Sequence, residues 1–170
     1  SEAVELADIE LRRHNVRLTH YIAARLPPVM ADTILIEQVL VNLMKNGAES
    51  IQHAQRPPSG RSVELRVVPK HTEEGEVVEF SVQDTGKGLA PEVLERLFEA
   101  FFSTKQEGMG MGLNLCRSIV ESHQGRMQAR NIYNGTDVVG CRFSFWLPPA
   151  KPADDTTNSV ANEQTPRTIA

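Results

Sequence analysis

The stretch at residues 32–55 has the longest helical pattern in the chain, and its side chains limit what such a helix can pack against. On a helical wheel its apolar residues fill an arc of about 160°: Leu35, Ile36, Val39, Leu40, Leu43 and Ile51. Asn46 falls inside this arc, Asn42 lies at its edge one turn earlier, and Glu49 lies at the same edge one turn later. An amide among apolar side chains is costly unless it is hydrogen-bonded. The pattern therefore predicts either an asparagine satisfied by a backbone carbonyl or an oxygen ligand for a metal ion, and a neutral amide oxygen suits Mg²⁺.

A second polar residue stands in an apolar position at the end of the segment 76–84. Alternate residues within 78–82 are apolar and share one face of a predicted strand, and the next residue on that face is Asp84. Asp and Gly are common turn residues, so the run "DTGKG" is compatible with an ordinary turn. It is also compatible with a carboxylate that accepts an N–H donor in a half-apolar pocket. The exocyclic amine of adenine is such a donor, whereas guanine presents a carbonyl there, and Gly86 and Gly88 would let backbone approach a flat ring.

A glycine-rich loop, "KQEGMGMGLNLC", leads directly into another helical pattern. Gly108, Gly110 and Gly112 free the backbone, and the helix that follows offers its positive end and unpaired N–H groups to a phosphate. Lys105 could add a point charge. The spacing is neither G-x-G-x-x-G nor a loop closed by Gly-Lys-Ser/Thr. The alternative is a flexible connector without a ligand.

The remaining patterns predict helices and strands without strict β-α-β alternation, which favours an α+β fold with helices on one face of a mixed sheet. A short helix over 1–14 has Val4, Ile9 and Leu11 among charges, and the following strand has Val16, Leu18 and His20 on one face. Further predicted elements are strands at 62–70, 76–84, 125–132 and 138–147, and helices at 90–101 and 112–123.

Composition excludes several classes of function. A net charge of -4 argues against a general nucleic-acid binder. Cys116 and Cys141 do not form a C-x-x-C pair, so we expect reduced thiols in a cytoplasmic protein. No apolar run reaches the roughly 20 residues that cross a bilayer, so no membrane contact of this region is expected. The first residue is Ser, which is compatible with a piece of a longer protein whose membrane anchor would lie upstream.

Four segments in this order resemble the motifs of the ATP-binding catalytic domain of sensor histidine kinases, which share a superfamily with gyrase-type topoisomerases, heat-shock chaperones and mismatch-repair ATPases. "VNLMKNGAES" resembles the N box, "DTGKGL" the G1 box, "LFEAFFSTK" the F box and "GMGMGLNLCRSIVESHQG" the G2 box. The resemblance extends over residues 15–148 and is strongest to kinases of the nitrogen-regulatory and oxygen-sensing type.

The resemblance implies a two-layer α/β sandwich of the α+β class, with a mixed five-stranded sheet packed on three helices and a mobile ATP lid at about 89–111. It implies ATP and Mg²⁺ as ligands, with Asn46 on the metal, Asp84 on the adenine amine, and Asn42, Asn46 and Lys105 as catalytic residues. Phe98, Phe101 and Phe102 would pack at the lid's hinge or partner face. The implied ATP-binding residues are Asn42, Lys45, Asn46, Glu49, Asp84, Gly86, Gly88, Lys105, Gly108, Met109, Gly110, Met111, Gly112 and Leu113.

The same resemblance divides the chain into three parts. Residues 1–14 would be a helical lead-in from a dimerisation and phosphoacceptor domain, residues 15–149 the catalytic domain, and residues 150–170 a disordered tail or linker. The implied partners are that dimerisation domain and a cognate response regulator, and no nucleic acid.

Phosphoryl transfer to a separate histidine is favoured over hydrolysis of ATP. The ATPase relatives have a Glu four residues before the metal-binding Asn, and here that position is Asn42. Glu37 lies about 180° around the helix from Asn46 and cannot replace it. A phosphoacceptor histidine is expected in a His-Glu/Asp-x-x-x-Pro-like context, which surrounds none of His14, His20, His53, His71 and His123. The alternatives are a nucleotide-binding regulatory module without transfer and a standalone ATPase.

Three departures from the family's motifs bear on the site. Asn46-Gly47 replaces the usual Asn-Ala, and glycine costs a helix up to about 1 kcal/mol relative to alanine, which predicts a locally looser helix. Arg142 stands where a Gly-x-Thr/Ser-Phe pattern places a hydroxyl that would help to hold adenine through water. His123-Gln124-Gly125 replaces His-Gly-Gly.

Overall fold

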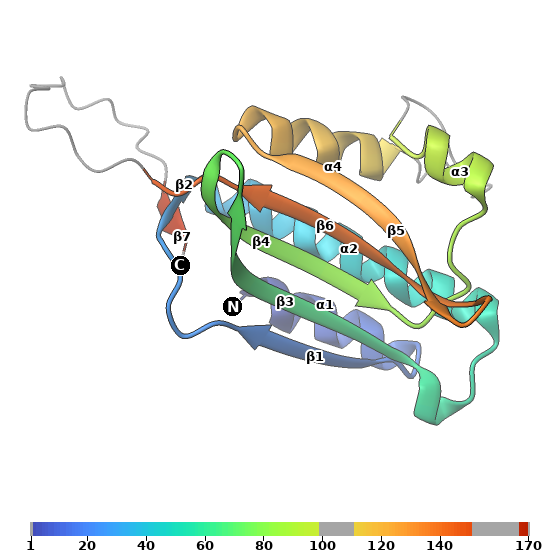
Figure 1. Ribbon diagram of the computed structural model, residues 1–170. Coiled ribbons are helices and arrows are strands. Elements are labelled where there is room, and N and C mark those ends of the chain that lie inside the picture. Colours follow the sequence, from blue (N-terminus) through green and yellow to red (C-terminus); the bar gives the residue numbers. More distant parts are fainter. Residues whose placement is uncertain (1, 99–110, 151–166, 170) are drawn as a thin grey trace, which may run out of the picture.

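The computed structural model describes residues 2–98, 111–150 and 167–169, which form a five-stranded sheet covered by helices on a single face, and a small two-stranded sheet (Figure 1). Figure 1 looks onto the opposite face of the sheet, which no described helix covers. The helices are α1 (Glu2–Arg13), α2 (Thr33–Ala54), α3 (Pro91–Arg96) and α4 (Met111–Ser122), with a 3-10 turn at Pro58–Gly60. The strands are β1 (Arg17–Ile22), β2 (Val29–Ala31), β3 (Ser62–Thr72), β4 (Gly75–Asp84), β5 (Arg126–Asn134), β6 (Asp137–Leu147) and β7 (Arg167–Ile169).

The main sheet has five strands in the order β1-β3-β4-β6-β5. β1 pairs with β3 in parallel, whereas the pairs β3–β4, β4–β6 and β5–β6 are antiparallel, so the sheet is mixed. The helix-covered face of the two central strands is apolar, and Phe80 on β4 stacks on Phe145 on β6 with ring centroids 4.8 Å apart. The predicted α+β fold with a five-stranded mixed sheet is confirmed.

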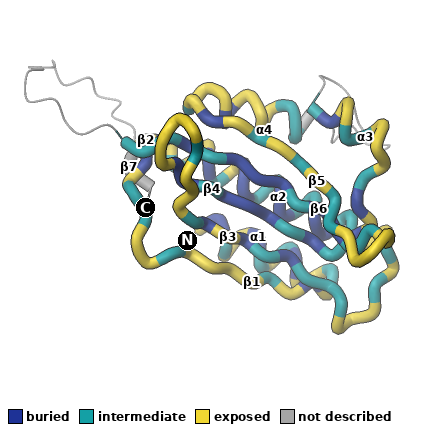
Figure 2. Tube along the Cα trace, viewed as in Figure 1, coloured by how far each residue is buried: buried dark blue, intermediate teal, exposed yellow. Residues whose placement is uncertain are grey.

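Helix α2 lies against the middle of the sheet and supplies much of the buried core (Figure 2). It begins after Asp32, an N-cap whose carboxylate accepts the Leu35 N–H at 3.2 Å. Leu35 is 37% exposed, because it lies at the edge of the apolar arc. The helix runs through Gly47 without a break and ends at Gln55, whose φ of 54° is left-handed.

Helix α1 packs on α2 through Ala3, Ala7 and Leu11, all buried. Ile9, an apolar residue of the same helix, lies off this face and is 59% exposed. Two buried alanines at helical spacing present small side chains to α2 on this face. Helix α1 thus shares the hydrophobic core with α2 and the main sheet, and the origin of residues 1–14 in a dimerisation domain stays a prediction.

Two features near the chain ends were not predicted. Strand β2 pairs antiparallel with β7, which gives Arg167–Ile169 a place in a two-stranded sheet although composition suggested a disordered tail. The rest of 151–170 lies outside the described residues. On β1, Leu18 is half-buried but His20 is exposed, because β1 is an edge strand whose outer half is uncovered.

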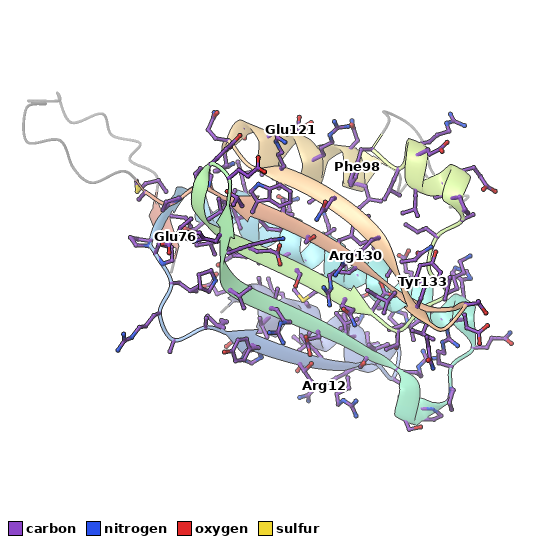
Figure 3. All side chains as sticks on the ribbon, in the orientation of Figure 1. Arg12, Glu76, Phe98, Glu121, Arg130 and Tyr133 are labelled. Carbon is purple, nitrogen blue, oxygen red and sulfur yellow. The ribbon has the colours of Figure 1, made fainter. Side chains whose placement is uncertain are left out.

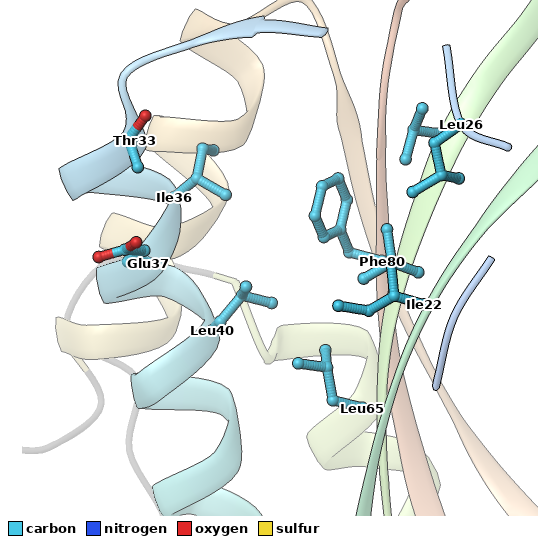
Figure 4. Close-up of a pocket in the computed structure, with 10 residues that line it drawn as sticks. Ile22, Leu26, Thr33, Ile36, Glu37, Leu40, Leu65 and Phe80 are labelled. Atoms are coloured by element: carbon cyan, nitrogen blue, oxygen red, sulfur yellow. The ribbon is translucent and has the colours of Figure 1, made fainter. Parts of the chain in front are cut away.

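An apolar cavity of about 110 Å³ lies between the first half of α2 and the sheet (Figure 4). Ile36, Leu40, Leu65 and Phe80 are among its lining residues, and Glu37 contributes a polar group. None of the predicted ATP-binding residues lines this cavity. Of the helices in the described part of the chain, none is long and apolar enough to cross a membrane.

Candidate functional site

Asp84 ends β4 as a buried carboxylate on the helix-covered face, 4% exposed, as its period-two position predicts. Its Oδ1 accepts the Gly86 N–H at 2.8 Å, and the Cys141 backbone N–H on β6 donates to the same carboxylate. Burial raises the pKa of Asp84 from 3.8 to about 7, although both backbone donors act to lower it. Burying the Asp84 carboxylate among apolar side chains destabilises the folded state when the group is ionised. This cost favours a ligand-binding role for Asp84 over an ordinary turn.

Helix α2 passes directly over Asp84 at Gly47. A Cβ on Gly47 would lie 3.1 Å from the Asp84 Cβ and 3.2 Å from Val63 Cγ2. These distances are tighter than ordinary contacts, so glycine allows the helix to approach the strand end. This close approach places Asn46, the neighbour of Gly47, at the same end of the sheet as Asp84.

The loop after Asp84 is held against α2 and β3. The Thr85 hydroxyl donates to the Gly60 carbonyl at 2.6 Å and accepts the Ser62 N–H at 3.0 Å. Gly86 packs on Ser50 of α2 so closely that a Cβ would overlap the serine hydroxyl and lie 2.7 Å from its Cβ. The absence of a side chain at Gly86 is therefore a packing requirement of this loop.

The end of the loop is fixed by β5. The Asn131 side chain accepts the Leu89 N–H at 2.8 Å and donates to the Leu89 carbonyl at 2.6 Å, in the manner of a neighbouring strand. Gly88 has a φ of 71°, and a Cβ there would lie 2.8 Å from Asn131 Oδ1 and closer still to Val138. A side chain at Gly88 would be excluded by both backbone conformation and space.

Helices α2 and α4 form the two walls beside this loop and run antiparallel. Near one end, the Asp32 N–H donates to His123 Nε2 at 3.0 Å. Further along, Asn42 Nδ2 lies 3.9 Å from Cys116 Sγ. Asn46 is four residues after Asn42 on α2, and Gly112 is four residues before Cys116 on α4. Because the helices are antiparallel and rise equally per residue, Asn46 and Gly112 lie at the same level.

The first turn of α4 therefore lies opposite Asn46. Among the described residues, no atom lies within 4 Å of a Cβ placed on Gly112, so the described part of the fold leaves space beside this turn. Leu113 packs against the core and anchors the turn. The N–H groups of a helix's first turn lack partners within the helix, so this opening is suited to an anion.

The structure brings together the predicted residues on α2, on the loop after β4 and in the first turn of α4. Lys45, Asn46 and Glu49 are half-buried, and Asn46 and Glu49 each interact with other groups of the fold. Phe98 is half-buried, with the Arg117 guanidinium carbon 5.6 Å from its ring centroid. The remaining predicted residues lie outside the described part of the chain: Lys105, Gly108, Met109 and Gly110, together with Phe101 and Phe102.

The protein side chains at this site supply only some of the oxygen ligands that Mg²⁺ needs. Within residues 2–98, 111–150 and 167–169, no three His, Cys, Asp or Glu side chains gather as a metal site would require. Asn46 brings an amide oxygen and Glu49 lies one turn away on α2. Mg²⁺ is commonly held by few protein oxygens together with water and phosphate, so these residues fit the ion when a triphosphate supplies the remaining oxygens.

Arg142, which stands where the family's motif has a hydroxyl, faces away from the predicted adenine position. Arg142 Nε donates to Gln83 Oε1 at 2.8 Å, and both side chains lie on the face of the sheet away from the helices. Cys141, the register partner of Asp84, points to the site instead and is 2% exposed. Burial and the nearby Asp84 carboxylate raise the pKa of the Cys141 thiol to about 12. The site wall thus contains an uncharged thiol and no guanidinium from this position.

The sequence pattern of the histidine kinase-, DNA gyrase B- and HSP90-like ATPases matches residues 31–151, which contain α2, the loop after β4 and α4. The chain belongs to this family. Its relatives include the C4-dicarboxylate transport sensor protein DctS of Rhodobacter capsulatus, 46% identical over 75% of this chain. The sensor protein FixL of Bradyrhizobium diazoefficiens is 40% identical over 88% of this chain. The match covers 18% of the first relative and 27% of the second, so this chain spans a minor part of such proteins.

Solved structures agree with this family assignment. The catalytic domain of the histidine kinase ThkA has a TM-score of 0.65 and 29% identity, with 86% of this chain and 88% of that domain covered. Full-length ShkA in complex with AMPPNP has a TM-score of 0.68 and 26% identity, with 90% of this chain and 30% of that protein covered. The predicted resemblance to the catalytic domains of sensor histidine kinases is confirmed.

Two residues that were not among the predicted site residues, Asn131 and Arg56, hold the loop after β4. Asn131 does so through the Leu89 contacts described above, and Arg56, just beyond α2, donates to three backbone carbonyls of the loop and of β6. No periodic pattern marks a side chain whose partners are backbone carbonyls. Arg56 could have been noticed in the sequence only as a polar residue just beyond the helix that bears the predicted site residues.

Proposed function

We propose that this domain binds Mg-ATP and delivers the γ-phosphoryl group to a histidine on a separate dimerisation domain, for relay to a response-regulator aspartate. The observation that carries the proposal is the buried Asp84 carboxylate at the end of β4, beneath the helix that bears Asn42 and Asn46. The proposal assigns each end of the nucleotide to a different part of this site.

Adenine would lie against Gly86 and Gly88 with its amine donating to Asp84. The pKa of Asp84 is raised because burial removes water from its carboxylate, and the adenine N–H would replace part of that lost hydration. Guanine would turn a carbonyl oxygen toward the carboxylate, so we expect ATP to be preferred over GTP by about a hundredfold or more, because the pocket would hold two unpaired acceptors.

The triphosphate would lie between α2 and α4. Asn46 would hold Mg²⁺, Asn42 would support the phosphates, and the first turn of α4 would donate N–H groups from Gly112 and Leu113. Bound Mg²⁺ supplies charge neutralisation for the transferring phosphoryl group, and the protein's part is to position the donor oxygens. Lys45, Glu49 and Lys105, with the glycine-rich residues at 108–111, complete the proposed phosphate contacts.

Hydrolysis is disfavoured because the position four residues before Asn46, where the ATPase relatives have a glutamate base, is Asn42. Asn42 occupies the position of the base and contacts Cys116. Glu37 lines the apolar cavity at the other half of α2, away from Asn46. Transfer to water requires a base within reach of the attacking oxygen, so the nucleophile would instead be a histidine of another domain.

Two of the histidines contact other groups of the fold. His123 is bonded to the Asp32 N–H and to the Ile119 carbonyl, and His14 contacts Gln52. The acceptor would thus lie in the dimerisation domain, and the response regulator would receive the phosphoryl group from it. We propose a cytoplasmic location for the domain, in a protein whose other parts determine any membrane anchoring.

The test is a transfer assay with labelled ATP, Mg²⁺ and an added dimerisation domain that contains the acceptor histidine. Wild type and the exposed-site control Asp137→Asn should label the acceptor, whereas Asp84→Asn and Asn46→Ala should not. ATP binding without any labelling would point to a regulatory nucleotide-binding module. Steady phosphate release without an acceptor would point to an ATPase and contradict the proposal.

A further inference from the structure

Arg56 forms a bridge between three segments that surround the adenine position. Its Nε donates to the Thr85 carbonyl at 3.0 Å, and its Nη2 donates to the Gly86 carbonyl at 3.1 Å and to the Val138 carbonyl at 3.4 Å. Arg56 itself follows the left-handed residue that ends α2. One half-buried guanidinium therefore joins the end of α2, the loop after β4 and the start of β6.

The first of these bonds acts on the peptide group that holds Asp84. The Thr85 carbonyl and the Gly86 N–H belong to one planar peptide unit and point in opposite directions. Arg56 donates to the carbonyl side of this unit, and the N–H side donates to Asp84 Oδ1 at 2.8 Å. Hydrogen bonds in such a chain polarise one another, so the guanidinium both orients this peptide and strengthens its N–H as a donor.

The second bond fixes the next peptide unit. The Gly86 carbonyl is held by the same guanidinium, and Gly86 is pressed against Ser50 on its other side. Without Arg56, both carbonyls would lose a charged donor, and each peptide would turn toward water to replace it. Turning the first peptide would withdraw the Gly86 N–H from Asp84.

We propose that Arg56 is a positioning residue for adenine recognition, which orients the Thr85–Gly86 peptide so that Asp84 faces the ligand before binding. This inference rests on the proposed binding of ATP and adds a residue to which no role had been assigned. A loop that is already ordered binds more tightly, because less conformational freedom is lost on association.

Arg61 is a matched control for a purely structural role. Its Nη2 donates to the His14 carbonyl at 2.6 Å and its Nε to the Asn15 carbonyl at 3.3 Å, in the turn between α1 and β1. Arg61 thus makes the same kind of bond to backbone carbonyls, but at a turn away from Asp84. Removing it should lower stability without acting on adenine recognition.

The experiment measures ATP and GTP affinities by calorimetry, and thermal midpoints, for wild type, Arg56→Ala, Arg56→Lys and Arg61→Ala. We expect Arg56→Ala to weaken ATP binding about tenfold or more and to reduce the preference for ATP over GTP. Arg56→Lys should recover part of the affinity, and Arg61→Ala should keep the wild-type affinity and preference. Millimolar methylguanidinium should restore ATP binding to Arg56→Ala, with sodium chloride at equal ionic strength as the control.

The pH profile gives a second readout. The titratable group of the described chain that faces Asp84 is the Cys141 thiol on β6, and it stays uncharged near neutrality. The Gly86 N–H acts to lower the pKa of Asp84, so its loss in Arg56→Ala should raise that pKa. ATP affinity falls when Asp84 is protonated at low pH, and the pH at which half of the affinity is lost should therefore be higher in Arg56→Ala than in wild type.

The outcomes separate this inference from the proposed function. If wild type fails to bind ATP, the proposed function fails. If wild type binds and folded Arg56→Ala binds ATP equally well, with an unchanged preference over GTP, the positioning role is overturned. Should Arg56→Ala fail to fold, Arg56→Lys decides, because wild-type affinity and pH profile in that variant would overturn the role of the forked guanidinium.

Discussion

Replacing Asp84 by asparagine is expected to stabilise the unliganded domain above pH 7 while it removes ATP binding. The carboxylate has a pKa of about 7 in the folded chain and an ordinary value of 3.8. The folded state therefore binds a proton more readily than the unfolded state does. Stability from this group is fully present below pH 3.8 and is lost as the pH rises through about 7.

The size of the effect follows from the two pKa values. Between pH 5 and pH 8, ionisation of Asp84 should lower the free energy of unfolding by about 2.5 kcal/mol. Asparagine does not ionise, so it should not show this loss. Its amide oxygen can still accept the Gly86 N–H, but its amino group cannot pair with the Cys141 N–H, so part of the gain is offset.

Urea denaturation of wild type and Asp84→Asn at pH 5 and pH 8 measures the effect directly. The difference in unfolding free energy between the two proteins should shift by about 2.5 kcal/mol in favour of the variant from pH 5 to pH 8. Other titrating groups act equally in both proteins and cancel. An equal difference at both pH values would refute the reasoning that burial holds this carboxylate partly protonated.

Three further predictions concern packing and reactivity. Gly86→Ala should lower the free energy of unfolding by about 1–3 kcal/mol, because its Cβ has no room beside α2, whereas Gly112→Ala should be neutral or stabilising in thermal melts. If Gly112→Ala nevertheless weakens ATP binding, the loss reports ligand contact at the first turn of α4. Cys116 and Cys141 should resist a thiol reagent at pH 8 in the native state, since burial raises the pKa of their thiols to about 11 and 12; rapid native labelling would contradict this. His123→Ala should lower the free energy of unfolding in urea by about 0.5–1.5 kcal/mol, because the Asp32 N–H loses its acceptor. An unchanged midpoint would show that this hydrogen bond contributes nothing to stability.

The polar residues in apolar places were the strongest sequence signal, and the structure bears out their placement. Asp84 lies on the buried face that the alternation with Phe80 and Val82 predicts. Such signals work because a strand or helix repeats its facing at a fixed period. The same period applied to β6 would have placed Cys141 inward beside Phe143 and Phe145 and Arg142 outward, in agreement with the structure.

Other features left no periodic trace. The parallel pairing of β1 with β3 depends on tertiary contacts, and strands as short as β2 and β7 have no measurable alternation. The buried face of α1 consists largely of the small residues Ala3 and Ala7, whereas the more hydrophobic Ile9 is exposed, so hydrophobicity alone does not identify this face. Arg56 acts on backbone carbonyls, which every sequence has, and only the folded chain shows which of them it reaches. Figure 3 places Arg130 over the sheet and Phe98 beside α4, which likewise depends on how distant segments meet.

The most direct test of the central claim is calorimetry of Mg-ATP binding to wild type, Asp84→Asn and Asn46→Asp, with GTP as the control. The account predicts that wild type binds ATP and not GTP, that Asp84→Asn abolishes binding, and that Asn46→Asp changes its Mg²⁺ dependence. Equal binding of ATP and GTP by wild type, or ATP binding that survives in Asp84→Asn, would contradict the assignment of Asp84 to adenine and with it the proposed site.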